Sequence, residues 1–113
     1  MTSRRAFAAV RHQPGEVLTE DALLALAAGR RPAVSDMDAL RALATAGDRG
    51  ALRTIEDLRR RRYELVVLDD DLESSRRAYQ LIDFRDLTIE PLESGYQAAG
   101  SLDGFHLYRR TWP

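Results

Sequence analysis

The order of apolar and polar residues along the chain predicts short strands that alternate with helices. A proline and a glycine make a turn at residues 14–15, and a very short extended stretch follows it. Thr19 then stands where a helix N-cap is expected, and Gly29 follows an alanine- and leucine-rich run as the residue after a helix end. These positions predict a helix over residues 20–28.

Two longer helices and the most regular strand come next. Residues 31–34 are expected to be extended, because the residue before a proline is disfavoured in helices. Apolar residues at helical spacing predict a helix over residues 36–46, and Asp48 can cap another helix that ends in the basic run 59–62. Residues 63–68 contain four consecutive apolar residues, which is typical of a strand buried on both faces.

The last third of the chain has a less regular pattern. Residues 76–82 predict a weak helix. A further helix is expected to start at Pro91, which suits a first turn, and to run to Ala99. Residues 104–109 alternate apolar and polar side chains, which indicates a strand with one face more exposed than the other. We expect this last strand to lie antiparallel at an edge of the sheet.

Together these elements predict an α/β fold, a small sandwich of about four strands, mostly parallel, with helices packed on the sheet. The chain contains no internal repeat and no low-complexity linker. This indicates a single domain over residues 1–113, in which residues 1–13 are a candidate flexible segment. A chain of this length can bury one hydrophobic core.

The composition narrows the function classes. The chain has 17 basic and 18 acidic side chains, a formal charge of −1 and no cysteine. It therefore has no disulfide framework and no thiolate metal site, and its slightly acidic balance argues against nucleic-acid binding. The longest apolar run, residues 22–28, is far shorter than the roughly 20 residues that cross a bilayer. We expect no membrane span in this chain.

Three consecutive carboxylates are the clearest candidate for chemistry. Asp69, Asp70 and Asp71 follow the carboxyl end of the best-defined strand, where open α/β sheets tend to bind ligands. They could hold Mg²⁺, which prefers hard oxygen ligands, in a small ligand-binding or signalling domain. Successive side chains that leave a strand point in different directions, however. We therefore favour the interpretation that they cap the next helix and solvate a loop.

The other reactive side chains form no catalytic set. The arginines at 59–62 could bind phosphates, but we favour a solvated helix end whose cations suit the helix dipole. His12 and His106 have no companion at metal-ligand spacing. Ser74 and Ser75 lack the glycine-flanked turn of a hydrolase nucleophile. The residues themselves predict no cofactor and no catalytic residue.

Five segments in a particular order carry a family resemblance. Residues 17–32, 36–47, 52–59 and 62–69 follow one another, and residues 104–109 form a closing strand that begins with glycine. In this order they resemble the soluble C-terminal, extracytoplasmic domain of bacterial polytopic glycosyltransferases of the GT-C class. That class includes the relatives of dolichyl-phosphate-mannose-protein mannosyltransferases and of aminoarabinose transferases.

The resemblance implies an accessory domain without a catalytic role. Such a domain lies on the extracytoplasmic face of the bacterial cytoplasmic membrane, and its partners are a transmembrane catalytic core and the glycan acceptor. The core uses a polyprenyl-phosphate sugar donor, and an acidic residue in an early extracytoplasmic loop acts as its catalytic base. This chain does not include that loop. No family catalytic residue is therefore transferred to any position here.

Two other interpretations stay open. One is a cytoplasmic, stand-alone domain that binds Mg²⁺ at Asp69 to Asp71. The other is a protein-interaction module that dimerises through an exposed edge strand at residues 105–108.

Overall fold

The structure is a computed structural model that describes residues 4–30, 37–69 and 89–111. Its helices are α1 (Arg4–His12), α2 (Ala22–Ala27), α3 (Met37–Thr45), α4 (Arg49–Arg59) and α6 (Ile89–Gly95). Its strands are β1 (Glu16–Thr19), β2 (Tyr63–Leu68), β3 (Tyr96–Leu102) and β4 (Phe105–Arg110). The predicted extended piece at 31–34 and the predicted helix at 76–82 lie outside the described residues.

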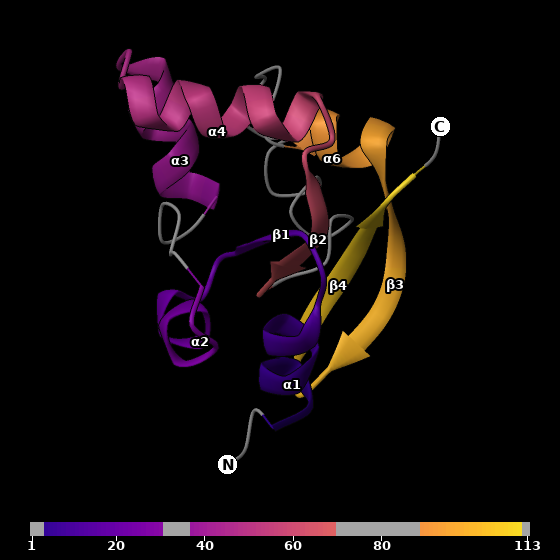
Figure 1. Ribbon diagram of the computed structural model, residues 1–113. Coiled ribbons are helices and arrows are strands. Elements are labelled where there is room, and N and C mark those ends of the chain that lie inside the picture. Colours follow the sequence, from indigo (N-terminus) through magenta and orange to yellow (C-terminus); the bar gives the residue numbers. More distant parts are fainter. Residues whose placement is uncertain (1–3, 31–36, 70–88, 112–113) are drawn as a thin grey trace.

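The strands form one mixed sheet in the order β1-β2-β4-β3 (Figure 1). Only β1 and β2 run parallel, whereas β2 with β4 and β4 with β3 are antiparallel. The α/β class is confirmed, but the expectation of a mostly parallel sheet is wrong. The reason is the hairpin between β3 and β4, whose two-residue turn at Asp103 and Gly104 has φ values of 54° and 87°. Such a turn joins only antiparallel strands.

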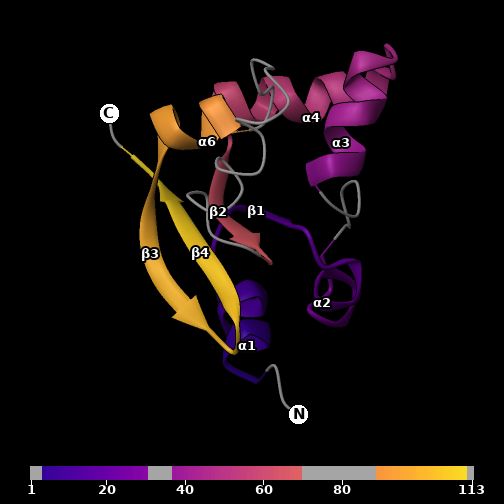
Figure 2. The ribbon, with the colours of Figure 1, turned by 180° about the vertical axis from the view of Figure 1, so that it is seen from behind.

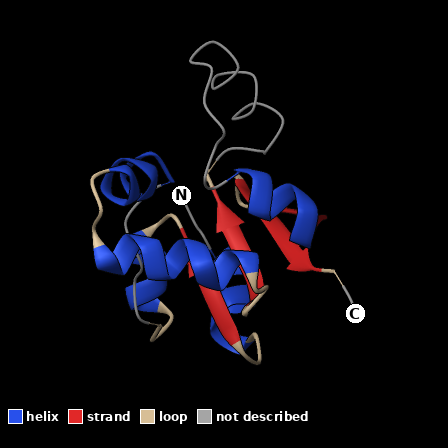
Figure 3. Cartoon of the chain, turned by 90° about the horizontal axis from the view of Figure 1, so that it is seen from above, coloured by secondary structure: helices blue, strands red, loops and turns tan. Residues whose placement is uncertain are grey.

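Helices cover both faces of this sheet. In Figure 1, α3, α4 and α6 lie above the strands and α1 and α2 lie below them. The view from above shows α4 and α6 crossing over the strands (Figure 3), and the view from behind shows the β3-β4 hairpin in front of α1 (Figure 2). The result is a three-layer arrangement with one apolar cluster on each side of the sheet.

Strand β2 contributes to both clusters. Leu65 and Val67 pack with α1 and α2, whereas Val66 and Leu68 pack with the other helical layer. Successive side chains of a strand point to opposite faces of the sheet. Because helices cover both faces, all four side chains are buried. The predicted strand with two buried faces is confirmed.

The ends of the helices follow local chemistry. Asp48 caps α4 as predicted, since its carboxylate accepts a hydrogen bond of 2.9 Å from the Ala51 amide. The predicted cap of α2 is wrong by two residues: Asp21 caps this helix and accepts from the Leu24 amide at 3.0 Å. The Thr19 hydroxyl instead accepts from the Asp21 amide at 3.2 Å and so holds the capping residue in place.

Two predictions in the last third are wrong. The predicted helix from Pro91 to Ala99 ends at Gly95, and the chain continues directly as β3. The helix propensity of the alanines is overridden by pairing with β4, to which β3 is joined by the Asp-Gly turn. Strand β4 is antiparallel but central: residues 106–108 pair with β2 on one side and with β3 on the other, so the strand offers no free edge. Strands β1 and β3 form the edges.

Helix α1 lies within the segment considered flexible from the sequence. Ala6 and Val10 of this helix are buried against the sheet. At its C-terminal end, the Arg30 guanidinium donates to the carbonyls of Val10 at 3.2 Å, Gly15 at 2.9 Å, and Gln13. Since Arg30 follows α2, this side chain ties the two lower helices together.

The first turn of α1 is capped from the opposite end of the chain. The Asp103 carboxylate, in the β3-β4 turn, accepts hydrogen bonds from the amides of Arg5 at 2.8 Å and Ala6 at 2.9 Å. These amides, together with the Arg5 charge, hold the pKa of Asp103 below its ordinary value. Helix α1 and the hairpin therefore stabilise each other.

We expect Asp103→Gly to loosen α1 while leaving the sheet intact. Glycine tolerates the positive φ of the turn but cannot cap the helix. Amide hydrogen exchange should become faster in α1 and stay unchanged in β2, with Asp103→Asn as an intermediate control that keeps an acceptor oxygen. A lowered pKa means that the ionised Asp103 carboxylate stabilises the folded state above the ordinary aspartate pKa of about 3.9. In the wild type, α1 should therefore loosen in the same way when the pH falls below about 3.9 and the carboxylate becomes protonated. Unchanged exchange in α1 would contradict this role.

Candidate functional site

The candidate site lies at the carboxyl ends of the parallel strands β1 and β2, which lie next to each other at one end of the sheet. Glu20 follows β1 and Asp69 follows β2. The Glu20 amide donates to the Val67 carbonyl at 3.0 Å, and the Asp69 amide donates to the Glu20 carboxylate at 2.9 Å. Two acidic residues that are 49 positions apart in the sequence thus lie together.

Of the predicted carboxylate cluster, only Asp69 is among the described residues. It is exposed, immediately after the last residue of β2. Asp70 and Asp71 lie outside the described residues, so the Mg²⁺ prediction stays a prediction. Within residues 4–30, 37–69 and 89–111, no group of three or more metal-ligating side chains is present.

Sequence reasoning missed the position of Glu20. From the sequence Glu20 was only the first residue of the predicted helix over residues 20–28, yet its carboxylate accepts a hydrogen bond from the Asp69 amide, directly after the neighbouring strand. A signal existed: acidic residues follow both the extended stretch before Thr19 and the strand at residues 63–68. Pairing of these strands in parallel brings their carboxyl ends together. The periodicity alone did not reveal that pairing.

The arginines at residues 59–62 mainly contact other residues of the same chain. Arg60 pairs with Glu56 at 3.0 Å and Arg62 with Asp57 at 3.3 Å. Arg61 donates to the carbonyl of Thr111 at 3.2 Å, beyond the end of β4. These contacts favour the structural interpretation over a phosphate site.

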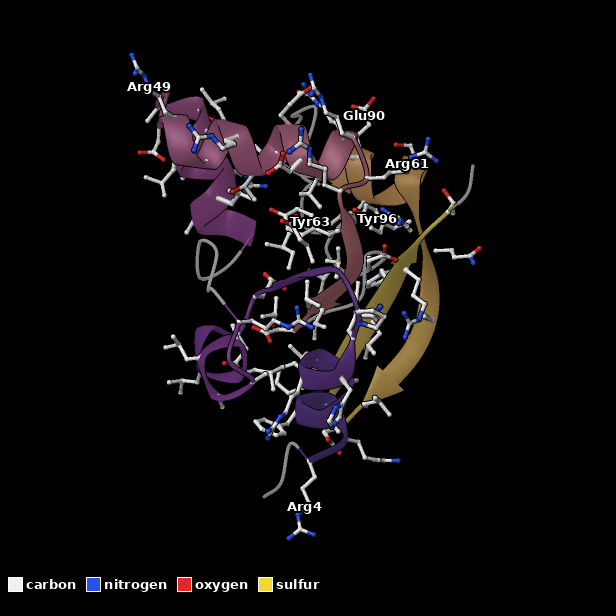
Figure 4. All side chains as sticks on the ribbon, in the orientation of Figure 1. Arg4, Arg49, Arg61, Tyr63, Glu90 and Tyr96 are labelled. Atoms are coloured by element: carbon white, nitrogen blue, oxygen red, sulfur yellow. The ribbon has the colours of Figure 1, made fainter. Side chains whose placement is uncertain are left out.

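Two tyrosines form the most strongly perturbed titratable pair in the described residues. Tyr96, the first residue of β3, donates its hydroxyl to the Tyr63 carbonyl at 3.1 Å. Figure 4 shows the pair beneath the upper helices, close to Arg61. Burial raises the pKa of Tyr96 to about 12. Burial, followed by the carboxylates of Asp57 and Glu16, raises the pKa of Tyr63 to about 12 as well.

These shifts predict a loss of stability at high pH. The unfolded chain ionises its tyrosines near pH 10, whereas folded Tyr63 and Tyr96 stay neutral until about pH 12. The free energy of unfolding should therefore be insensitive to these groups below about pH 10 and fall between about pH 10 and pH 12. The chain has no lysine or cysteine to obscure the effect. Urea unfolding at several pH values would measure it.

The matched variant is Tyr96→Phe. It removes one of the two titrating groups, so the fall between about pH 10 and pH 12 should become shallower. Absorbance of tyrosinate in the folded wild type should show two groups that ionise later than free tyrosine. A fall of unchanged steepness in Tyr96→Phe would assign the effect to other residues.

Comparison of the chain with models of protein families, with curated proteins and with solved structures found no match. Among the described residues, no helix is both long enough and apolar enough to cross a membrane.

Proposed function

We propose that this chain is a non-catalytic accessory domain of a membrane glycosyltransferase that uses a polyprenyl-phosphate sugar donor. In this proposal the domain lies on the extracytoplasmic side of the cytoplasmic membrane. Its partners are the transmembrane catalytic core and the glycan acceptor, and the acidic residue that acts as catalytic base belongs to the core.

The observation that carries the proposal is how the resembling segments gather in space. Residues 17–19 form most of β1, residues 63–68 form its parallel partner β2, and residues 105–109 lie in β4, the next strand of the sheet. Residues 37–45 form α3 and residues 52–59 lie in α4; these two helices contact each other and cover one face of that sheet. Segments scattered along the chain thus form one contiguous unit, as expected if the resemblance reflects a shared domain.

The architecture also agrees with a supporting role. Helix α1 and the β3-β4 hairpin complete this unit, and hydrogen bonds from the α1 amides to the Asp103 carboxylate join them. At the sheet edge where a ligand is most often bound, the Glu20 carboxylate accepts from the backbone of the neighbouring strand, and Asp21 caps α2. These acidic side chains have structural partners that account for their positions.

The first test follows the polypeptide in the cells from which the sequence comes. Antibodies raised against the purified chain should detect an antigen in the membrane fraction, with a mass far above the 12.7 kDa of this chain. Purification of that antigen in detergent should yield a polytopic protein with sugar-transferase activity. An antigen of 12.7 kDa found only in the aqueous fraction would contradict the proposal.

Ligand binding by the isolated chain distinguishes the alternatives. We expect its melting temperature to stay unchanged with Mg²⁺ and with nucleotide sugars, because a ligand raises stability only by binding the native state. We also expect no sugar transfer by the isolated chain. A rise with millimolar Mg²⁺ that is lost in Asp69→Asn, but kept in the distant Asp57→Asn, would favour the Mg²⁺-binding domain instead.

A further inference from the structure

The sheet has an open edge at β3. In Figures 1 and 2 this strand forms the outer margin of the molecule, and none of the described elements lies beyond it. The other edge strand, β1, has only four residues and is contacted by α2. Strand β3 has seven residues, of which the five at 97–101 are exposed. Such an edge presents backbone amides and carbonyls with which another extended segment of polypeptide can pair.

Strand β3 lacks the charges that usually protect an edge. Its sequence, Tyr-Gln-Ala-Ala-Gly-Ser-Leu, contains no charged residue, although 31% of the chain is charged. The other three strands all carry charge, at Glu16 in β1, Glu64 in β2, and Arg109 and Arg110 in β4. Because charged residues and proline on an edge strand prevent pairing with another chain, the composition of β3 favours such pairing.

The hairpin turn shows which backbone groups of β3 face the open edge. Leu102 and Phe105 are paired on either side of the two-residue turn, and the residues that close such a turn are hydrogen-bonded to each other. In an antiparallel ladder, hydrogen-bonded pairs alternate with pairs that are not bonded to each other. The preceding residue, Ser101, therefore directs its amide and its carbonyl away from β4, toward the open edge.

The start of β3 has a second residue of this kind. The Thr111 amide donates to the Gly95 carbonyl at 2.9 Å, so the backbone of Gly95 faces the β4 side. Gln97, two residues further along the strand, faces β4 as well. Ala98 therefore directs its amide and its carbonyl toward the open edge, as Ser101 does.

A bulge sets the spacing of these two residues. Ala98 and Gly100 pair with consecutive residues of β4, which leaves Ala99 as the extra residue. The outward groups of Ala98 and Ser101 are therefore three positions apart, whereas in a regular strand they recur at every second residue. An ordinary extended peptide does not match this spacing at both positions. A second β3 strand that runs antiparallel has the same spacing in reverse order.

We propose that two copies of this chain pair through their β3 strands, antiparallel and about a two-fold axis, and join their four-stranded sheets into one. Ala98 of one copy lies opposite the partner's Ser101, and each amide donates to the carbonyl opposite. Two-fold pairing places every residue opposite a residue of the same strand, and β3 has no charge that would be repelled by its own copy. The inference goes beyond the proposed function and does not depend on it.

Sedimentation equilibrium of the purified chain is the first test. The mean mass should rise with protein concentration from 12.7 kDa toward twice that value. Amide hydrogen exchange then locates the contact: exchange at Ala98 and Ser101 should slow as the concentration rises, whereas Gln97 and Gly100, whose amides already face β4, should change much less. A mass of 12.7 kDa at all concentrations would overturn the proposal, since any strand bound at this edge would then be foreign.

Charge variants test the register of the two strands. Ala98→Lys with Ser101→Lys puts like charges opposite each other, so the dissociation constant of the dimer should rise at least about tenfold. Ala98→Glu with Ser101→Glu should weaken the dimer in the same way. An equimolar mixture of the two variants should associate at least as tightly as the wild type, because each lysine then faces a glutamate. Thermal melts would verify that both variants are folded.

The matched control lies at α3, on the opposite side of the molecule from β3 (Figure 1). Ala42→Lys with Ala46→Lys adds the same charge at two exposed alanines and should change the dissociation constant less than about twofold, because charges far from the contact are screened. Equal weakening by the two lysine variants, or a mixture that fails to restore association, would overturn the proposal.

Discussion

Leu65→Ala is expected to lower the free energy of unfolding by about 3 kcal/mol, a large part of the total stability of a domain of this size. Leu65 lies in the middle of the sheet on β2 and is 0% exposed. Its side chain packs with Ala6 and Val10 of α1 and with Leu24 of α2. Truncation removes apolar contacts to both lower helices and leaves a cavity that strand pairing keeps from closing.

Urea unfolding of the wild type and Leu65→Ala would measure this effect. The matched control is Leu23→Ala, which removes the same atoms from a side chain that is 77% exposed and should change stability by less than about 0.5 kcal/mol. If the two variants lost similar stability, the assignment of Leu65 to the core and Leu23 to the surface would be wrong.

Gly15→Ala is the second large expected effect, a loss of about 2 to 3 kcal/mol. Gly15 has a φ of +87°, which alanine rarely adopts. A Cβ atom there would lie 2.3 Å from the Glu64 Cγ, so the Glu64 side chain would have to move. That side chain pairs with Arg110 of β4, and its displacement would disturb contacts between the sheet and the loop before β1.

Gly29→Ala separates the two causes. Gly29 also has a positive φ, of +73°, but a Cβ atom there would meet nothing within 4 Å. Its substitution should therefore cost only the backbone strain, roughly 1 to 2 kcal/mol. Thermal or urea unfolding of both variants would give the difference that belongs to Glu64. Equal losses would show that the contact at Glu64 relaxes without cost.

The candidate site illustrates what a linear sequence conceals. Asp69 was identified because a strand of apolar residues precedes it, which is a local pattern. Glu20 was not, because its relation to Asp69 depends on which strands pair and in which direction. Residues 105–108 were predicted to lie at an edge of the sheet because the strand pairing was unknown, whereas they lie in a central strand. The sequence Asp103-Gly104 is typical of a hairpin turn and would have indicated the preceding strand, β3.

Local chemistry determined the elements that the sequence predicts correctly. The buried strand at residues 63–68, the Asp48 cap of α4 and the end of α2 before Gly29 depend on side chains within a few residues of one another. Such features follow from periodicity and capping, whose energies are set by the nearby chain. The sequence by itself therefore determined the α/β class and most of the element boundaries before residue 70.

Tertiary structure decided the features that depend on distant partners. Helix α1 is held by Asp103, 97 residues away from Ala6, and β3 forms where alanines favour a helix because β4 pairs with it. The mixed strand directions and the meeting of Glu20 with Asp69 have the same origin. Pairing energies arise only when distant segments come together, and hydrophobic periodicity carries no information on strand order or direction.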